Sequence, residues 1–288
     1  MTEIPPLPPT VIEPMVRRAL DEDFGNAGDV TANLLVPASA SAKLFFKSRE
    51  TGVIAGMQAA QITYRMVDPA MEFKTLKGNG AQIKKGDVIA EVSGPVRSLL
   101  MAERTALNFL GRMSGIATLT SQYIDLVKGT KARIAATRKT TPGLRAIEKR
   151  AVLAGGGATH RQSLSDAIMI KDNHIALAGG IEKALQAIKD GADHMCKVSV
   201  EVDRLEQLEK ALPFAPDVVL LDNMGPDMLK QAVAIADAFD GPRPTLEASG
   251  GVNLKTARAI AQSGIDVISI GALTHSAPNF DIGLDAQA

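Results

Sequence analysis

The sequence predicts an α/β protein whose C-terminal part is an incomplete parallel β/α barrel. From Thr130 onward, short apolar strands alternate with amphipathic helices, which is typical of consecutive parallel βα units. Six such units can be counted, fewer than the eight of a closed barrel. Between Ala42 and Val96, by contrast, short runs punctuated by glycine favour small antiparallel sheets. A doubly wound parallel sheet is the alternative for the C-terminal part.

The apolar periodicity defines the elements of both parts. Residues 98–128 are predicted to be helical, with a break near Gly111–Gly115. We place the domain boundary in this stretch, so that residues 1–112 form an N-terminal domain and residues 113–288 a C-terminal domain, whose last residues can return to the first. Helices with apolar residues at i, i+3 and i+4 are predicted at 180–191, 202–212, 225–239 and 253–264. The barrel strands are predicted at Ala132–Ala136, Ala167–Ile170, Cys196–Val200, Val218–Leu221, Thr245–Ala248 and Val267–Ile270.

The composition is that of a folded cytoplasmic protein. Of the 288 residues, 45% are hydrophobic and 22% are charged, which is enough to bury a core. No apolar run approaches the ~18 residues of a membrane span, and the first residues lack the basic and apolar regions of a secretion signal. The single cysteine, Cys196, cannot form an internal disulfide. We therefore expect a cytoplasmic location and no membrane partner.

Positive charge is concentrated in one segment. Residues 128–171 contain ten Lys/Arg and only two acidic residues, although the whole chain has no net charge. The chain has no tryptophan and only two tyrosines, and turns interrupt the basic segment, so a nucleic-acid partner is not expected. A small polyanion is the favoured ligand, with a solvated basic face as the alternative.

Cationic residues follow the first strands of the predicted barrel, where barrel enzymes place their chemistry. Thr137, Arg138 and Lys139 come directly after the first strand. Lys171 follows the second strand, and Arg161 lies in the loop between the two. Leaving several cations unpaired at one barrel mouth is costly, so this set favours an anionic ligand.

Acidic residues end the next two strands. Glu201 and Asp222 can stabilise a cationic transition state, or hold ribose hydroxyls and a magnesium ion. As alternatives, they are N-terminal charges of the following helices, or they pair with the cations in a structural network that includes Asp166. His160, next to Arg161, is predicted to hydrogen-bond a ligand, with a backbone contact as the alternative.

Small residues follow the last two strands: Ser249, Gly250 and Gly251, and then Gly271 and Ala272. Glycine allows an anion to approach backbone N–H groups, and we expect the first group to lead directly into the helix predicted from residue 253. The sequence therefore predicts a phosphate cradle formed by the last two loops. A tight turn without a ligand is the alternative.

These residues lie in stretches that closely resemble the quinolinate phosphoribosyltransferases, also called nicotinate-nucleotide diphosphorylases (carboxylating). The signature stretch is TRKTTPGLRAIEKRAVLAGGGATHRQSLSDAIMIKDNHI. The resemblance also includes ERTALNFLGRMSGIAT before it, and VVLLDNM and LEASGGVNLKTARAIAQSGIDVISIGALTHS after it. It extends over nearly the whole chain, and long matches in the same order are far more specific than a short motif.

The resemblance implies the type II phosphoribosyltransferase fold, an α/β sandwich followed by an open barrel of about seven strands. It also implies a homodimer, or a higher oligomer, with active sites shared between subunits. The implied reaction joins quinolinate to 5-phosphoribosyl diphosphate in the presence of Mg²⁺. Its products are nicotinate mononucleotide, diphosphate and carbon dioxide, in de novo NAD synthesis.

The resemblance also implies roles for individual residues. The two quinolinate carboxylates are expected at Arg138, His160, Arg161 and Lys171, with Arg104 of ERTALN reaching in from the partner subunit. The catalytic residues Lys139, Glu201 and Asp222 are expected to face phosphoribosyl diphosphate, through which Mg²⁺ would be held, with the two carboxylates as candidate ligands. Thr137 belongs to the same substrate site, and the 5′-phosphate is expected at Ser249–Gly251 with Gly271 and Ala272. None of these positions departs from the family pattern.

Three other functions fit part of the sequence. Lys139 and Lys171 at strand ends fit a Schiff-base aldolase or decarboxylase, which borohydride would trap. The phosphoribosyltransferase-like protein found with molybdate transport is a close relative, but the intact ERTALN and IKDNH stretches favour the quinolinate enzyme. GAQIKKGDVIAEVSGPV resembles biotinyl carrier domains, but it lacks a modifiable lysine flanked by methionines.

Overall fold

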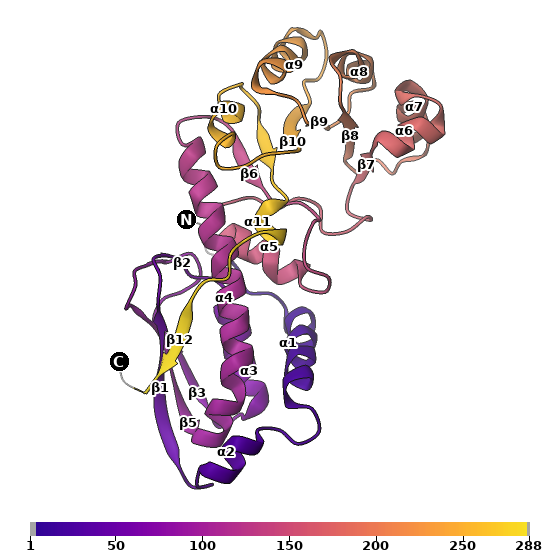
Figure 1. Cartoon of the computed structure of the whole chain (residues 1–288). Coiled ribbons are helices and arrows are strands. Elements are labelled where there is room, and N and C mark those ends of the chain that lie inside the picture. The colour runs from indigo at the N-terminus through magenta and orange to yellow at the C-terminus, as the bar shows by residue number, and fades with distance from the viewer. Residues whose placement is uncertain (1–3, 287–288) are drawn as a thin grey trace. The chain divides into compact units, whose positions relative to one another are not determined.

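The computed structural model describes residues 4–286, and the chain forms two compact units (Figure 1). The first unit contains the chain up to Ser121, residues Thr140–Gly156 and the chain from Leu273 onward. The second unit contains Gln122–Lys139 and Gly157–Ala272. The C-terminal segment is therefore grouped with the N-terminal part of the chain.

The first unit is an α/β sandwich with a four-stranded antiparallel sheet in the order β12-β1-β5-β3. Phe46 of the sheet, Tyr64 of α3 and Leu99 of α4 belong to one buried cluster, so both helices pack on the sheet (Figure 1). The strands are β1 (Ser41–Ser48), β3 (Glu72–Thr75), β5 (Val88–Pro95) and β12 (Ile282–Asp285), with a separate pair, β2 (Gly52–Val53) and β4 (Gln82–Ile83). The helices are α1 (Pro9–Phe24), α2 (Val30–Leu35), α3 (Met57–Val67), α4 (Val96–Val127) and α5 (Arg145–Ala154).

The predicted break in the long helix is wrong, because α4 is continuous from Val96 to Val127. Its two glycines instead allow the C-terminal segment to lie against the helix. A Cβ atom at Gly115 would lie 1.9 Å from the carbonyl oxygen of Pro278, and one at Gly111 would lie 2.9 Å from that of Phe280. The N–H of Phe280 also donates to the Gly111 carbonyl over 3.0 Å. Glycine at these positions is a packing requirement and not a helix stop.

The second unit is an open barrel of six parallel strands in the order β6-β11-β10-β9-β8-β7. From β7 to β11 this order follows the chain without the reversal that defines a doubly wound sheet, so that alternative is wrong. An isolated parallel bridge between Ala135 and Ala158 extends the sheet beyond β6. The strands are β6 (Arg133–Ala135), β7 (Ile168–Ile170), β8 (Val198–Val202), β9 (Val218–Asp222), β10 (Thr245–Ser249) and β11 (Val267–Ser269).

The predicted strands are confirmed, with shifted ends. The largest shift is at β8, which begins at Val198 and ends at Val202, so that Glu201 lies within the strand and not beyond it. The chain before β8 forms a turn in which the Cys196 N–H donates to the Asp193 carbonyl over 3.0 Å. This turn explains why the strand starts later than its apolar residues suggested.

Helices connect the strands of the second unit, and Figure 1 shows α7, α8 and α9 along their outer side. The buried residues of α7 are Ile181, Ala184 and Leu185, which confirms the predicted spacing. Within the described part of the chain, no helix combines the length and the apolar character that crossing a bilayer requires. The helices are α6 (Asp172–Ala178), α7 (Ile181–Gly191), α8 (Leu205–Ala211) with the 3-10 turn η1 (Leu212–Phe214), α9 (Pro226–Ala238) and α10 (Ala257–Ala261). A last short helix, α11 (Ala272–His275), begins at the end of the second unit and continues into the first.

Candidate active site

Strand register brings the predicted acidic residues onto one face of the barrel sheet. Glu201 of β8 is in register with Leu220 of β9, and Asp222 of β9 is in register with Ser249 of β10. Leu220 and Asp222 are two residues apart, so their side chains point to the same face. Glu201, Asp222 and Ser249 therefore share one face near the carboxyl ends of three neighbouring strands, which is where a parallel barrel places its active site.

Two arginines lie close together at the same edge. Arg138 follows β6, and Arg161 follows the bridge at Ala158. Burial lowers the pKa of the Arg161 guanidinium, nearby Arg138 lowers it further, and Asp166 acts in the opposite direction. Arg161 Nη1 donates to the Ala167 carbonyl over 2.8 Å, which orients the side chain. Two neighbouring cations that disfavour each other's charge form a good site for a carboxylate.

The backbone of Lys139 is fixed, while its side chain is exposed. Its N–H donates to the Thr137 hydroxyl oxygen over 3.0 Å, which closes a short turn after β6. The exposed side chain is therefore accessible to an anion bound at this edge of the barrel.

Lys171 and Glu201 form a direct ion pair between their Nζ and Oε2 atoms. Lys171 follows β7, and its side chain is 45% exposed, whereas that of Glu201 is 15% exposed. For these two residues, the structure shows the alternative in which an acidic residue of the site pairs with one of the cations. Asp222 has a different neighbour, since Asn223 Nδ2 donates to its Oδ2 over 2.7 Å. The two carboxylates are held separately, one by a cation and one by an amide.

An acidic cavity of about 370 Å³ opens beside these carboxylates. Glu201 and Asp222 line it together with Asp172 and Asp203, and Arg204 is the cation among the described residues of its lining. No group of three or more His, Cys, Asp or Glu residues among the described ones is arranged to hold a metal ion by itself. Mg²⁺ typically uses one or two carboxylates and completes its shell with substrate phosphates and water, so Glu201 and Asp222 fit a metal that arrives with a diphosphate.

The backbone of the predicted phosphate loop packs closely against Asn223, but the helix that follows the loop is shorter than expected. Gly250 has φ +86°, and a Cβ atom there would lie 2.2 Å from Asn223 Oδ1 and 2.9 Å from Asn223 N, so only glycine fits. The predicted helix start at residue 253 is wrong, because the Asn253 side chain accepts hydrogen bonds from Lys255 N and Thr256 N, and α10 begins only at Ala257. An anion at Ser249–Gly251 would therefore meet loop N–H groups without an adjoining helix end.

Gly271 and Ala272 complete the set, because β11 ends at Ser269 and α11 begins at Ala272. Both residues are half-buried. Since β10 and β11 are parallel neighbours, their carboxyl ends lie at the same edge as the Ser249 loop.

His160 has a buried acidic neighbour that the sequence prediction omitted. The distance from His160 Nε2 to Glu247 Oε2 is 3.7 Å. Burial raises the pKa of the Glu247 carboxyl, and a hydrogen bond from Ser269 opposes the rise. The sequence does contain a signal for this residue, because Glu247 is the one charged residue in the predicted strand Thr245–Ala248.

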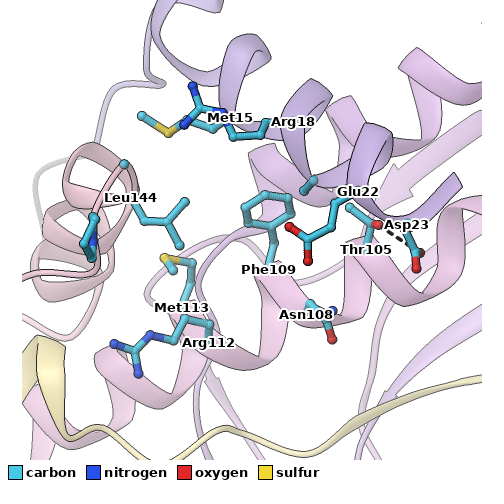
Figure 2. A pocket seen from close by; sticks show the side chains of 13 residues that line it. Met15, Arg18, Glu22, Asp23, Thr105, Asn108, Phe109, Arg112, Met113 and Leu144 are labelled. Atoms are coloured by element: carbon cyan, nitrogen blue, oxygen red, sulfur yellow. Dashed lines mark hydrogen bonds between the residues drawn. The ribbon is translucent and has the colours of Figure 1, made fainter. Parts of the chain in front are cut away.

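Arg104 belongs to the first unit, where it is exposed on α4. One turn further, a cavity of about 410 Å³ lies between α1, α4 and the loop before α5 (Figure 2). The Thr105 hydroxyl donates to Asp23 Oδ2 over 3.3 Å at its edge (Figure 2). None of the predicted site residues is among the described residues that line it, which include Arg18, Glu22 and Asn108. The chemistry predicted from the sequence is therefore concentrated in the second unit, whereas Arg104 belongs to the first.

Cations, carboxylates and a glycine loop at the carboxyl ends of one open barrel define a β/α-barrel enzyme that acts on anionic substrates. Models of the quinolinate phosphoribosyl transferase family match the chain in two parts. The N-terminal domain matches residues 29–114, and the C-terminal domain matches residues 116–285. The chain belongs to the quinolinate phosphoribosyltransferase family.

Individual relatives match most of the chain. The nicotinate-nucleotide pyrophosphorylase (carboxylating) of Mycobacterium leprae is 43% identical over 272 residues, covering 94% of this chain and 95% of that protein. The mitochondrial quinolinate phosphoribosyltransferase (decarboxylating) 2b of Nicotiana tabacum is 39% identical over 300 residues, covering 97% and 84%. The crystal structure of NadC from Streptococcus pyogenes superimposes with a TM-score of 0.93 at 37% identity, and the match covers 98% of each chain.

Proposed function

We propose that this chain transfers the phosphoribosyl group of 5-phosphoribosyl diphosphate to quinolinate and releases carbon dioxide, forming nicotinate mononucleotide for NAD synthesis. The proposal is carried by one observation. Arg138 and Arg161 lie together at the barrel edge that also presents Glu201 and Asp222. A dianionic aromatic acid and a ribose that becomes cationic need these two kinds of group side by side.

Quinolinate binds through its two carboxylates. Arg138, Arg161 and Lys171 supply the positive charge, and His160 supplies a further polar contact. Lys171 is paired with Glu201, and a quinolinate carboxylate would replace Glu201 as its partner. Arg104 of the partner subunit completes the pocket.

Phosphoribosyl diphosphate binds at the neighbouring strand ends. Its 5′-phosphate lies at Ser249–Gly251 with Gly271 and Ala272, and Thr137 and Lys139 face the diphosphate. As the bond from the ribose carbon to diphosphate breaks, the carbon gains positive charge, which Glu201 and Asp222 stabilise. Lys139 stabilises the charge that develops on the departing diphosphate. Bound Mg²⁺, held by the diphosphate with Glu201 and Asp222, would supply further neutralisation of that charge.

Decarboxylation needs no second group, because the reaction creates its own electron acceptor. When the ring nitrogen bonds to ribose, it becomes a pyridinium. The bond from ring carbon 2 to its carboxylate then breaks, carbon dioxide leaves, and the electron pair stays on carbon 2 beside the cationic nitrogen until a proton replaces it. The cations of the site hold the remaining carboxylate during this step.

The assembly we propose is a homodimer, open to further association, with each site shared between subunits. Exposed apolar residues on α2 support it: Val30 is 57% exposed, Leu34 is 85% and Leu35 is 77%. Large aliphatic side chains clustered on one short helix are typical of a surface that a partner covers. The exposed position of Arg104 on α4 is also consistent with a role at a neighbouring subunit.

We place the reaction in the cytoplasm. The chain has one cysteine, Cys196, and so lacks the internal disulfides that are common in secreted proteins. Fractionation of the source cells, followed by an activity assay of each fraction, tests this assignment.

Product formation tests the proposed activity. Purified protein is incubated with phosphoribosyl diphosphate, Mg²⁺ and either quinolinate or nicotinate, and nicotinate mononucleotide is measured. We expect kcat/KM to be about a thousandfold higher with quinolinate, because nicotinate leaves site cations without an anionic partner. Similar values for the two acids would contradict the assignment of Arg138, Arg161 and Lys171 to the carboxylates.

A further inference from the structure

Glu247 is a buried carboxyl group inside the second unit. It is the third residue of β10, and only 4% of its surface is exposed. Its register partners are Leu220 of β9 and Val267 of β11, which are both buried and apolar. Apolar side chains therefore fit this layer of the barrel, and a carboxyl group there needs polar contacts to offset its desolvation.

One oxygen of this carboxyl faces His160. Glu247 Oε2 lies 3.7 Å from His160 Nε2, a polar contact slightly longer than a hydrogen bond. The other oxygen, Oε1, is buried and has no hydrogen-bond partner among the residues that the structure describes. The Ser269 hydroxyl is a second polar neighbour, and the charged groups that act on the carboxyl are Glu201 and Lys171. Glu247 is thus directed at His160 from within the barrel.

The hydrogen bond that His160 Nδ1 accepts determines which ring nitrogen carries the proton. The backbone N–H of Arg161 donates to His160 Nδ1 over 2.8 Å. A ring nitrogen that accepts a hydrogen bond carries no proton, so the proton of the neutral imidazole is on Nε2, the atom that faces Glu247. A carboxyl group retains an acceptor oxygen in either protonation state, so Glu247 can hold this N–H throughout.

We propose that Glu247 is a positioning residue that holds the Nε2–H of His160 and so fixes the imidazole beside Arg161 for binding of a pyridine dicarboxylate. This inference rests on the proposed function, which assigns His160 and Arg161 to quinolinate. Without an acceptor at position 247, the ring turns or changes tautomer, and the contact to the Arg161 backbone is lost. The loop residues expected to hold the 5′-phosphate do not depend on this contact.

Two substitutions at Glu247 distinguish positioning from simple packing. Glu247→Leu removes the acceptor and matches Leu220 on the neighbouring strand, whereas Glu247→Gln keeps an acceptor oxygen in the same shape. Ser199→Ala is the matched control, because Ser199 is buried on the same face, two residues before Glu201, and its hydroxyl has no hydrogen-bond partner in the described part of the chain.

The KM for quinolinate is the kinetic readout. We expect it to rise about tenfold or more in Glu247→Leu, the effect of losing one polar contact that orients the binding site, and to change less than about threefold in Glu247→Gln and Ser199→Ala. The KM for phosphoribosyl diphosphate should change less than about twofold in all three variants. An unchanged quinolinate KM in folded Glu247→Leu would overturn the proposal.

Nitrogen-15 NMR of histidine-labelled protein gives a readout that does not need turnover. The His160 signals are identified by their absence from His160→Asn. We expect the Nε2–H tautomer in the wild-type protein and in Glu247→Gln, and a mixture or the Nδ1–H tautomer in Glu247→Leu. An Nδ1–H tautomer in the wild-type protein would overturn the proposal.

The quinolinate KM depends on the proposed function, whereas the His160 tautomer does not, so the two ideas can fail separately. If the wild-type protein forms no nicotinate mononucleotide, the proposed function fails, and the tautomer measurement still decides whether Glu247 holds His160. If Glu247→Leu does not fold, Glu247→Asp takes its place, because the shorter side chain withdraws the acceptor. Asp at this position should raise the quinolinate KM as Leu does, and a wild-type KM would count against the proposal.

Discussion

At the scale of single residues, the cations of the candidate site differ in how far they are buried. Arg161 is partly buried beside Arg138, which lowers its pKa, whereas the Lys139 side chain is exposed. The first arrangement suits a bound carboxylate that stays in place through the reaction. The second suits a group that follows a leaving diphosphate.

This difference predicts separate effects of two substitutions. Arg161→Ala should weaken quinolinate binding about a hundredfold, because it removes one charge from a desolvated pair of ions. Lys139→Ala should lower kcat by a similar factor, about a hundredfold, with little change in quinolinate affinity. Calorimetry with quinolinate and single-turnover kinetics measure the two effects.

The control for charge removal is Lys183→Ala, on the exposed side of α7 in the same unit. It should leave both quantities unchanged. Loss of quinolinate binding in Lys139→Ala, with phosphoribosyl diphosphate still bound, would show that the proposed roles are reversed.

At the scale of elements, close backbone approach determines where glycine is required. Gly115 lies in the middle of α4, where glycine ordinarily lowers helix stability, yet the Pro278 carbonyl occupies the space that a side chain would need. The C-terminal segment that leads to β12 is therefore anchored along this helix.

Gly115→Ala should lower the free energy of unfolding by about 3 kcal/mol, because the new methyl group must displace the Pro278 backbone. Urea unfolding followed by circular dichroism measures the change. Gly191→Ala, at the end of α7, is the matched control and should be neutral or stabilising, because a Cβ atom there would have no neighbour within 4 Å among the described residues. Equal stability of Gly115→Ala and the wild-type protein would mean that the segment does not need this contact.

Ionic contacts also tie elements of the barrel together at Asp266, just before β11. Its carboxylate accepts hydrogen bonds from Arg243 Nη1 over 2.7 Å and from Leu246 N over 2.8 Å, and it pairs with Lys131 at 2.7 Å. Burial alone would raise the pKa of Asp266, but the bonds from Arg243, Lys131 and Leu246 outweigh it and lower the pKa below its ordinary value. The folded protein thus holds the ionised form more strongly than the unfolded chain does.

Asp266→Asn should therefore destabilise the protein by about 2 kcal/mol at pH 7. Because the folded pKa is lowered, this contribution is complete above about pH 5 and is lost as the pH falls through the folded value. Urea unfolding between pH 3 and pH 7 should show the wild-type and variant curves converging at the acid end. Asp240→Asn, at an exposed position, is the control, and a pH-independent difference for Asp266→Asn would contradict the ionic explanation.

At the scale of the whole molecule, the two units carry different parts of the predicted machinery. The second unit contains the strand-end residues, and the first contains Arg104 and the exposed apolar residues of α2. In a homodimer with shared sites, a partner subunit would cover the apolar surface of α2, and Arg104 would reach the site of that partner.

Subunit mixing tests this arrangement. Arg104→Ala and Lys139→Ala should each have little activity alone, but a mixed dimer contains one site with neither substitution if Arg104 acts in the partner. Random exchange makes about half of the dimers mixed, so about a quarter of all sites should recover. Recovery near zero, with exchange verified by mass spectrometry of intact dimers, would place Arg104 in its own subunit's site or outside catalysis.

The sequence by itself determined the order of the barrel elements and the candidate site at their ends. Strand and helix periodicity are local, so the segments around Val218–Leu221 and Ile181–Leu185 could be located without tertiary information. Because parallel strands present their carboxyl ends at one edge, the residues that follow them could be predicted to share a site. The loop between Ser249 and Gly251 was located in the same way.

Tertiary structure alone decided which of these groups meet. The continuity of α4 depends on a segment more than 160 residues away, which gives Gly111 and Gly115 their role. Buried Glu148 is paired with Arg112 at 2.9 Å, and Glu247 faces His160, although no local pattern joins either pair. Strand register and long-range packing set such distances, and neither leaves a periodic signal in the sequence. The physical reason is that burying a charge is tolerated only where the fold supplies a partner, and that partner comes from elsewhere in the chain.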